Sequence, residues 1–259
     1  MRPLLRVLAF TVALSAGFAA AGAQASSAGV TPSDSAYARV LATYVARGLV
    51  DYKGLMAHAG PLTDYVHRLA TADTTGWSRA RQIAFWINAY NALTLERVVR
   101  AYPVSSITKI KPTLGVLPGK GVWKEPVRVA GGTTTLDAIE HEILRARFGE
   151  PRIHFAINCA SRSCPPLASR PYTAQGLDAE LDAAARGFIG DPRFNQFAEP
   201  PAPLRLSKIF EWYGDDFVHA AGSVPAYVRR YLPPERAARL VPDGARVTFL
   251  PYDWSLNEQ

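Results

Sequence analysis

The residues best suited to chemistry lie close together near the middle of the chain. Cys159 and Cys164, the only two cysteines, follow His154 closely. A thiol beside an imidazole can act as a nucleophile, because histidine lowers the thiol pKa and accepts its proton. Two alternatives stay open: a Cys159–Cys164 disulfide, the default in an oxidising compartment, or two unreactive thiols. No ligands are paired at zinc-like spacing, so neither a metal site nor another cofactor is predicted.

Local geometry complicates the pairing of this histidine with a thiol. Residues 153–159 are dense in strand-forming types and predict a β-strand. Alternating side chains would place His154 and Asn158 on one face and Cys159 on the other, unless a bulge or turn intervenes. Cys164 follows in a loop and carries no such restriction.

A second candidate group lies on a predicted helix over residues 136–147. At helical spacing, Glu140 falls in the middle of an apolar face and His141 at its border. A carboxylate on such a face must be paired with a cation or carry a proton. Either state would suit a functional site, although an ion pair with one of the many arginines is the structural alternative.

A third group lies in the longest predicted helix, from Ser78 to Tyr102. Between residues 83 and 99 this helix is apolar on nearly every side, which is typical of a buried central helix. Asn88 and Asn91 lie one turn apart within it, on nearly the same side. Buried amides need hydrogen-bond partners, which neighbouring backbone groups or a ligand could supply.

These groups predict one shared pocket. Cys159 would be the nucleophile, His154 or His141 the base, and Asn91 or a backbone amide the oxyanion donor. We expect Glu140 or His141 to approach the 154–164 segment, because consecutive elements usually lie side by side. The Asn88/Asn91 turn would form the opposite wall. Other residues assigned to substrate binding are Asn158, Ser161 and Asp253.

The remaining elements predict the fold class. A hairpin is expected near residues 127–135, a last strand at 247–252, and helices outweigh strands without a regular βαβ alternation. We therefore expect an α+β fold in which the buried helix packs on a small, mostly antiparallel sheet. By analogy this resembles the papain and transglutaminase layouts. Those folds carry a cysteine at the start of the buried helix, whereas residues 78–82 contain none.

Four segments in this order resemble the family named domain of unknown function 547. The resemblance covers most of the chain from about Val50 onward and implies one domain. It implies no particular activity and no assigned catalytic residues. The segments are Phe85–Leu93, Thr135–His141, Ile153–Pro166 and Tyr252–Asn257.

The amino-terminal segment predicts export. A short positive region with Arg2 and Arg6 precedes an apolar run and then small residues, as in a cleavable secretory signal over residues 1–25. Cleavage is expected after Ala23 or Ala25, which leaves one globular domain over residues 26–259 without a membrane span. The protein would then be periplasmic or secreted.

Charge narrows the choice of partners. The formal net charge of +7 is modest and spread along the chain, which argues against a nucleic-acid-binding protein. Four lysines lie in a loop rich in proline and glycine: Lys109, Lys111, Lys120 and Lys124. They form either an ordinary solvated surface or a rim that attracts an anionic cell-envelope ligand. We expect an exported hydrolase or transferase; the alternative is a non-catalytic ligand-binding domain with a disulfide-stapled loop.

Overall fold

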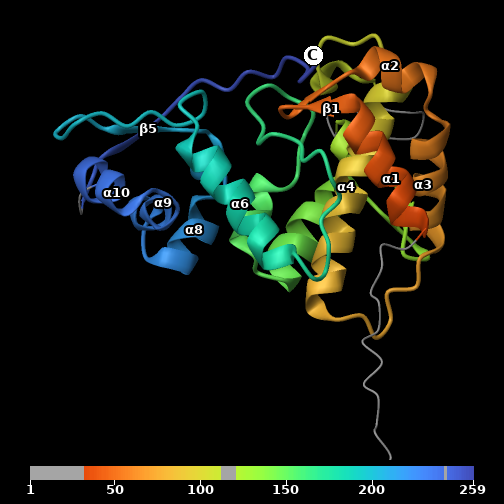
Figure 1. Ribbon diagram of the computed structural model, residues 1–259, viewed down its shortest axis with the longest axis horizontal. Helices are drawn as coiled ribbons and strands as arrows, with labels where there is room; N and C mark the ends of the chain where they lie inside the picture. Colours follow the sequence, from red (N-terminus) through yellow and green to blue (C-terminus); the bar gives the residue numbers. More distant parts are fainter. Residues whose placement is uncertain (1–31, 112–120, 242–243) are drawn as a thin grey trace, which may run out of the picture.

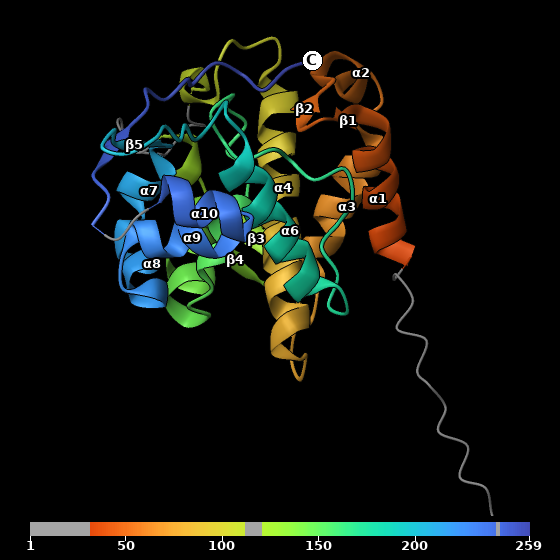
Figure 2. The ribbon, with the colours of Figure 1, turned by 60° about the vertical axis from the view of Figure 1, so that its left-hand side comes forward.

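The computed structural model describes residues 32–111, 121–241 and 244–259. The predicted signal peptide, its cleavage sites and Lys120 lie outside these residues. Two views place the amino-terminal helices at one end of the molecule and the carboxy-terminal helices at the other (Figure 1, Figure 2). Each end has its own cluster of buried apolar side chains. The helices of the first end are α1 (Pro32–Tyr44), α2 (Tyr52–Ala57), α3 (Gly60–Thr71) and α4 (Arg79–Ala101).

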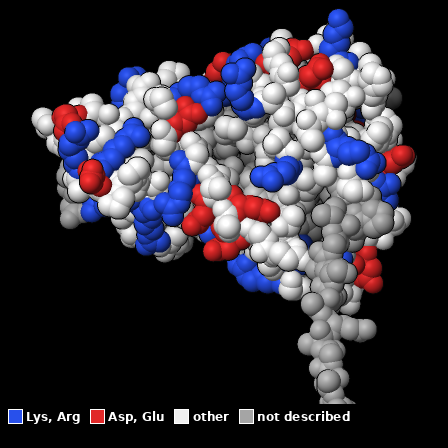
Figure 3. All heavy atoms as spheres, in the orientation of Figure 1, with Lys and Arg blue, Asp and Glu red and all other residues white. Residues whose placement is uncertain are grey.

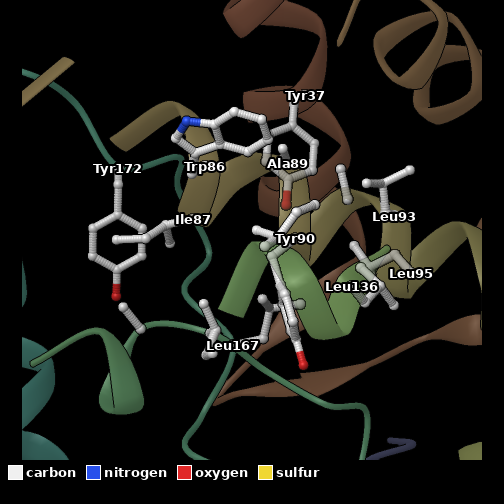
Figure 4. Close-up of a cluster of buried hydrophobic side chains, with 14 of the residues drawn as sticks. Tyr37, Trp86, Ile87, Ala89, Tyr90, Leu93, Leu95, Leu136, Leu167 and Tyr172 are labelled. Carbon is white, nitrogen blue, oxygen red and sulfur yellow. The ribbon is translucent and has the colours of Figure 1, made fainter. Parts of the chain in front are cut away.

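Helix α4 confirms the predicted buried central helix. The side chain of Ser78 caps it by accepting a hydrogen bond from the backbone N–H of Arg81, and the helix ends before Pro103. Figure 4 shows Trp86, Ile87 and Tyr90 of this helix among the buried side chains of the first cluster. Burial on nearly all sides explains why its sequence lacks a polar face.

In the described parts of the chain, three separate two-stranded sheets accompany the helices, which confirms the α+β class. Two of them are antiparallel and one is parallel, so the expected single sheet under the central helix is replaced by three small ones. This arrangement does not support the papain and transglutaminase analogy. The pairs are β1 (Val45–Ala46) with β2 (Leu49–Val50), β3 (Val127–Val129) with β4 (Gly132–Thr134), and β5 (Leu204–Leu206) with β6 (Val247–Phe249).

The predicted helix at 136–147 is present, with an unusual inner geometry. It begins as α5 (Leu136–Ala138), capped by the side chain of Thr135, and continues as the π-helical segment η3 (Ile139–Arg147). Wider π-helical turns are rare and occur frequently at functional sites. The segment packs against α4.

The strand predicted for residues 153–159 is wrong. Residues Pro151–Phe155 form the 3-10 helix η4, and the backbone then runs irregularly to Cys159. Pro151 occupies the first turn, and the Glu150 side chain accepts a hydrogen bond from the N–H of Arg152. The apolar run that resembled a strand is instead buried on several sides, so strand alternation does not decide where His154 and Cys159 point.

The second end of the molecule is mostly helical. Its apolar cluster is centred on aromatic side chains, including Phe155, Phe210 and Phe217. The elements there are α6 (Leu177–Gly190), α7 (Ile209–Trp212), α8 (Gly214–Ala221), α9 (Val224–Tyr231) and α10 (Pro234–Leu240). Two further 3-10 turns lie in the predicted loop, η1 (Ile107–Lys109) and η2 (Val122–Lys124).

The carboxy-terminal segment connects the two ends. After β6 the chain runs back across the molecule to the region of α2 (Figure 1), and the N–H of Val50 in β2 donates to the carbonyl of Asn257 over 2.9 Å. On the way, the N–H of Arg162 donates to the carbonyl of Ser255 over 2.9 Å. This segment therefore passes beside the loop of residues 158–165, which holds both cysteines and is called the cysteine loop below.

No helix of the described ranges is both long and apolar enough to cross a membrane. On the face shown in Figure 3, basic and acidic side chains are interspersed.

Candidate functional site

One cavity of about 290 Å³ collects all four predicted catalytic side chains and the second cysteine. Its walls come from α4, the α5–η3 helix, the cysteine loop, α7 and the carboxy-terminal segment. Elements far apart in the chain therefore build a single site. The predicted residues in its lining are Glu140, His141, His154, Cys159 and Cys164.

The two cysteines face each other in this cavity. Both are thiols, and their Sγ atoms lie 2.7 Å apart. The backbone N–H of Cys159 also donates to the Sγ atom of Cys164 over 2.9 Å. Two hydroxyl groups contact the Cys159 sulfur: Ser161 Oγ at 3.2 Å and Tyr252 Oη at 3.2 Å.

This environment separates the two thiols chemically. Hydrogen bonds from Cys164, Ser161 and Tyr252 lower the pKa of Cys159, although burial and the nearby Glu140 oppose the shift. Burial raises the pKa of Cys164 well above the usual thiol range. Of the pair, Cys159 is therefore the sulfur that ionises, and it is also the more exposed one.

Glu140 lies on the apolar face of its helix, as its position in the sequence predicts. Only 8% of its surface is exposed. A tyrosine hydroxyl pairs with this carboxylate in place of an arginine: Tyr90 Oη donates to Glu140 Oε2 over 3.2 Å. In Figure 4 the hydroxyl of Tyr90 points out of the apolar cluster. Burial, followed by the charge of Glu140, raises the pKa of Tyr213, which keeps this hydroxyl protonated.

His154 is held by an acid that sequence analysis did not identify. Its Nε2 lies 2.7 Å from Asp216 Oδ2, and its ring stacks on Tyr213 with 3.9 Å between centroids. Burial lowers the pKa of His154, so the neutral ring donates from Nε2 and leaves Nδ1 unprotonated. Nδ1 has no hydrogen-bond partner among the described residues.

Arg145 completes this cluster. It makes two hydrogen bonds to Asp216, Nε to Oδ2 at 2.7 Å and Nη2 to Oδ1 at 2.9 Å. Burial raises the pKa of Asp216, but the hydrogen bonds from His154 and Arg145 outweigh it and hold that pKa well below the usual range. Arg145 Nη1 donates to Nδ1 of His141 over 3.0 Å. Neither histidine forms a hydrogen bond with Cys159, so the expected thiol–imidazole pair is not made in this structure.

The two asparagines of α4 do not form the expected opposite wall of this cavity. Asn91 donates to the carbonyl of Ala156 over 2.9 Å and accepts from the N–H of Asn158 over 2.8 Å. Asn88 makes the same pair of bonds with the backbone of Tyr172, at 2.8 and 2.9 Å. Both amides therefore satisfy backbone groups of neighbouring loops. The residue of this turn that reaches the cavity is Tyr90.

The other predicted binding residues shape the loops around the cysteines. Asn158 Nδ2 donates to the carbonyl of Pro165 over 2.7 Å. Asp253 accepts from the N–H of Ser255 over 2.8 Å and lies outside the cavity lining. Ser161 is buried and bridges Cys159 and Tyr252, with 2.8 Å between its Oγ and Tyr252 Oη.

Partly exposed aromatic side chains line the cavity at its mouth, and the sequence analysis assigned none of them to substrate binding. Trp254 is 37% exposed and packs on Tyr252, with 4.6 Å between ring centroids. Trp212 and Trp123 lie at 5.9 and 6.0 Å from Trp254. Trp254 follows Tyr252 in one of the segments that carried the family resemblance, which was the available signal for both residues.

The lining holds no group of ligands suited to a metal. Among the residues that the structure describes, no three or more histidine, cysteine, aspartate or glutamate side chains converge on a possible metal position.

Residues 74–189 match the model of the family described as protein of unknown function, DUF547. This confirms the resemblance over that segment, which contains Tyr90, Glu140, His154 and both cysteines. It does not include Asp216, Tyr252 or Trp254. No curated protein and no solved structure matches the chain.

Proposed function

We propose that the cavity is the active site of an exported hydrolase or transferase in which Cys159 is the nucleophile. The observation that carries this proposal is the position of Cys159, which lines the cavity while Cys164, Ser161 and Tyr252 surround its sulfur. Hydrogen bonds to a thiolate stabilise the charged and reactive form. A sulfur that only packed in the core would not need three such neighbours.

The proposed reaction is acyl transfer. The thiolate of Cys159 adds to a carbonyl carbon, the bond to the leaving group breaks, and that group departs with the electron pair and takes a proton from solvent. Water or a second acceptor then attacks the thioester carbon. Its proton passes to Nδ1 of His154, and Cys159 leaves as the thiolate. In this scheme Asp216 orients the imidazole through Nε2.

A model ester tests this proposal. Incubation of the protein with p-nitrophenyl acetate should release p-nitrophenolate and add one acetyl group to Cys159, located by peptide mass spectrometry. Cys159→Ser should lose the adduct. If the folded protein alkylates at Cys159 with iodoacetamide but never acquires an acetyl group there, the acyl-transfer proposal is wrong.

The alternative is a non-catalytic domain in which a Cys159–Cys164 disulfide staples the loop. The observation in its favour is the 2.7 Å separation of the two sulfurs. Lys124 at the cavity, paired with Asp137 at 3.9 Å, would then help to bind an anionic envelope ligand. Thiol counting on native protein treated with excess reduced glutathione separates the two proposals, since a structural staple still leaves no thiol to label.

Export is part of the proposal and rests on the amino-terminal residues. Amino-terminal sequencing of protein recovered outside the cytoplasm should begin at Gln24 or Ser26. Recovery of the chain with Met1 intact in the membrane fraction would overturn this part of the proposal.

A further inference from the structure

The two cysteines differ in exposure to the cavity, as the attacking thiol and the second thiol of a thiol–disulfide exchange must. Cys159 is partly exposed to the cavity, whereas Cys164 is only 5% exposed. An incoming molecule therefore meets Cys159 first. Behind it, Cys164 lies 2.7 Å from the same sulfur, within reach of any group that becomes attached there.

The loop geometry holds this arrangement in place. Ala160 adopts a left-handed conformation with a φ of 59°, which turns the chain directly after Cys159. Asn158 ties the two flanks of the loop together: its Nδ2 donates to the carbonyl of Pro165 over 2.7 Å, and its Oδ1 accepts from the N–H of Ala160 over 2.9 Å. Because both flanks are fixed, the sulfurs can bond or separate with little movement of the backbone.

The chemistry of the two thiols matches these positions. Hydrogen bonds from Cys164 and from two hydroxyl groups lower the pKa of Cys159, so it is the better attacking thiolate at neutral pH. Burial raises the pKa of Cys164, which keeps that thiol protonated until a mixed disulfide has formed beside it. Each thiol thus has a separate role.

We propose that Cys159 and Cys164 form a reversible dithiol–disulfide couple that exchanges with an organic disulfide entering the cavity. The thiolate of Cys159 attacks one sulfur of that disulfide, a new S–S bond forms, and the other half leaves as a thiolate. Cys164 then loses its proton to solvent and attacks the Cys159 sulfur. The second half leaves as a thiolate, the Cys159–Cys164 bond closes, and the incoming disulfide has been reduced to two thiols.

The cavity suits one half of such a molecule. Its volume of about 290 Å³ is at the small end of ligand pockets, and tryptophan and tyrosine rings surround its mouth. The attacked sulfur would enter the cavity while the remainder of the disulfide lies over the aromatic mouth. Both a low-molecular-weight disulfide and an exposed disulfide of a polypeptide present this chemistry.

This inference shares its nucleophile with the proposed function but needs no acyl substrate. Experiments on the same wild-type protein can disprove either proposal without the other. Acetylation of Cys159 reports on acyl transfer, and closure of the Cys159–Cys164 bond reports on thiol–disulfide exchange. If the protein closes the bond but is never acetylated, thiol–disulfide exchange is supported and acyl transfer is not.

The test uses the reduced mature protein with oxidised glutathione, followed by intact mass. The wild type should lose the mass of two hydrogen atoms as the bond closes, without lasting adduct, and reduced glutathione in excess should reopen it. Cys164→Ser should trap one glutathione on Cys159, and Cys164→Ala provides a second variant if the serine does not fold. Cys159→Ser, with Cys164 buried, should form no adduct.

Reduction of insulin in a parallel reaction distinguishes the source of the disulfide. Insulin reduction with dithiothreitol as the electron donor, at least tenfold faster than in the Cys159→Ser control, indicates a polypeptide disulfide. Closure with glutathione alone indicates a small one. The inference is overturned if a folded Cys164 variant alkylates at Cys159 with iodoacetamide but traps no glutathione, and the wild type reduces insulin no faster than the Cys159→Ser control. It is also overturned if the closed bond resists reduced glutathione in the native protein, because that behaviour defines a structural cross-link.

Discussion

His154 and Asp216 form the closest contact between an imidazole and a carboxylate around the cavity, with 2.7 Å between Nε2 and Oδ2. The imidazole is buried, and its pKa is lowered by that burial. The unfolded chain therefore takes up a proton on this histidine at a higher pH than the folded protein does. Protonation then favours unfolding as the pH falls below about 6.5.

The first prediction follows from this difference. The free energy of unfolding of the wild type should decrease between pH 7 and pH 5.5, by at most about 1.4 kcal/mol per pH unit from this group. His154→Gln, which can still donate to Asp216, should remove that part of the pH dependence, whereas the same change at exposed His58 should not. Urea unfolding at pH 7 and at pH 5.5 measures this change in the free energy of unfolding. If the free energy of unfolding falls equally with pH in His154→Gln and in the wild type, the pH dependence does not come from His154.

The depressed pKa of Asp216 acts at lower pH. The folded protein keeps this carboxylate ionised below the pH at which the unfolded chain protonates it, so its stabilisation is complete above about pH 4 and is lost as the pH falls further. The pH window from 7 to 5.5 therefore reports on His154 without a contribution from Asp216.

The second prediction concerns the hydroxyl that supports the thiolate. Tyr252→Phe removes one hydrogen bond to the sulfur of Cys159, so the pKa of Cys159 should rise and its alkylation by iodoacetamide at pH 7 should slow by roughly tenfold. At high pH, where the thiol is fully ionised in both proteins, the two rates should converge. Tyr231→Phe on α9, outside the cavity lining, serves as the control. A rate difference that persists unchanged at high pH would indicate altered access.

Several parts of the fold were predictable because local and tertiary preferences agree there. Ser78 caps a helix whose sequence is apolar on all sides, and the structure contains that buried helix over nearly the expected range. Strand-forming residues around a Gly-Gly turn indicated the hairpin, which is present as β3 and β4. The apolar position of Glu140 likewise indicated a buried carboxylate.

The rest depended on contacts between residues far apart in the chain. Ile153 and its neighbours resemble a strand because they are buried on several sides, and periodicity does not distinguish this from a 3-10 turn. Asp216 lies 62 residues from His154, and Tyr252 lies 93 residues from Cys159. Neither pairing leaves a pattern in a single sequence, so sequence analysis identified one side of the site only.

The third prediction compares the two buried asparagines of α4. Asn91→Leu and Asn88→Leu each leave two buried backbone groups without partners, so each should destabilise the protein by about 2–4 kcal/mol. Only Asn91 holds the backbone at Ala156 and Asn158, directly before Cys159. Asn91→Leu should therefore also change the alkylation rate of Cys159 in the folded protein, whereas Asn88→Leu should not. Equal effects on alkylation would show that the rate follows global stability.

The fourth prediction concerns the aromatic mouth. Trp254 is 37% exposed and packs on Tyr252, Trp212 and Trp123, so Trp254→Ala should lower the free energy of unfolding by about 1–2 kcal/mol, less than the loss of a fully buried tryptophan would.

A thiol reagent that carries an aromatic ring should nevertheless be sensitive to the loss of Trp254. Stacking between aromatic rings contributes about 0.5–1.5 kcal/mol, so wild-type Cys159 should react several-fold faster with N-phenylmaleimide than with N-ethylmaleimide, relative to the same ratio for free cysteine. Trp254→Ala should reduce this preference toward that of free cysteine. Trp77→Ala is the matched control, because Trp77 lies outside the lining of this cavity and packs beneath Arg81. If Trp254→Ala keeps the full preference for the phenyl group, the aromatic mouth does not contact molecules that reach Cys159.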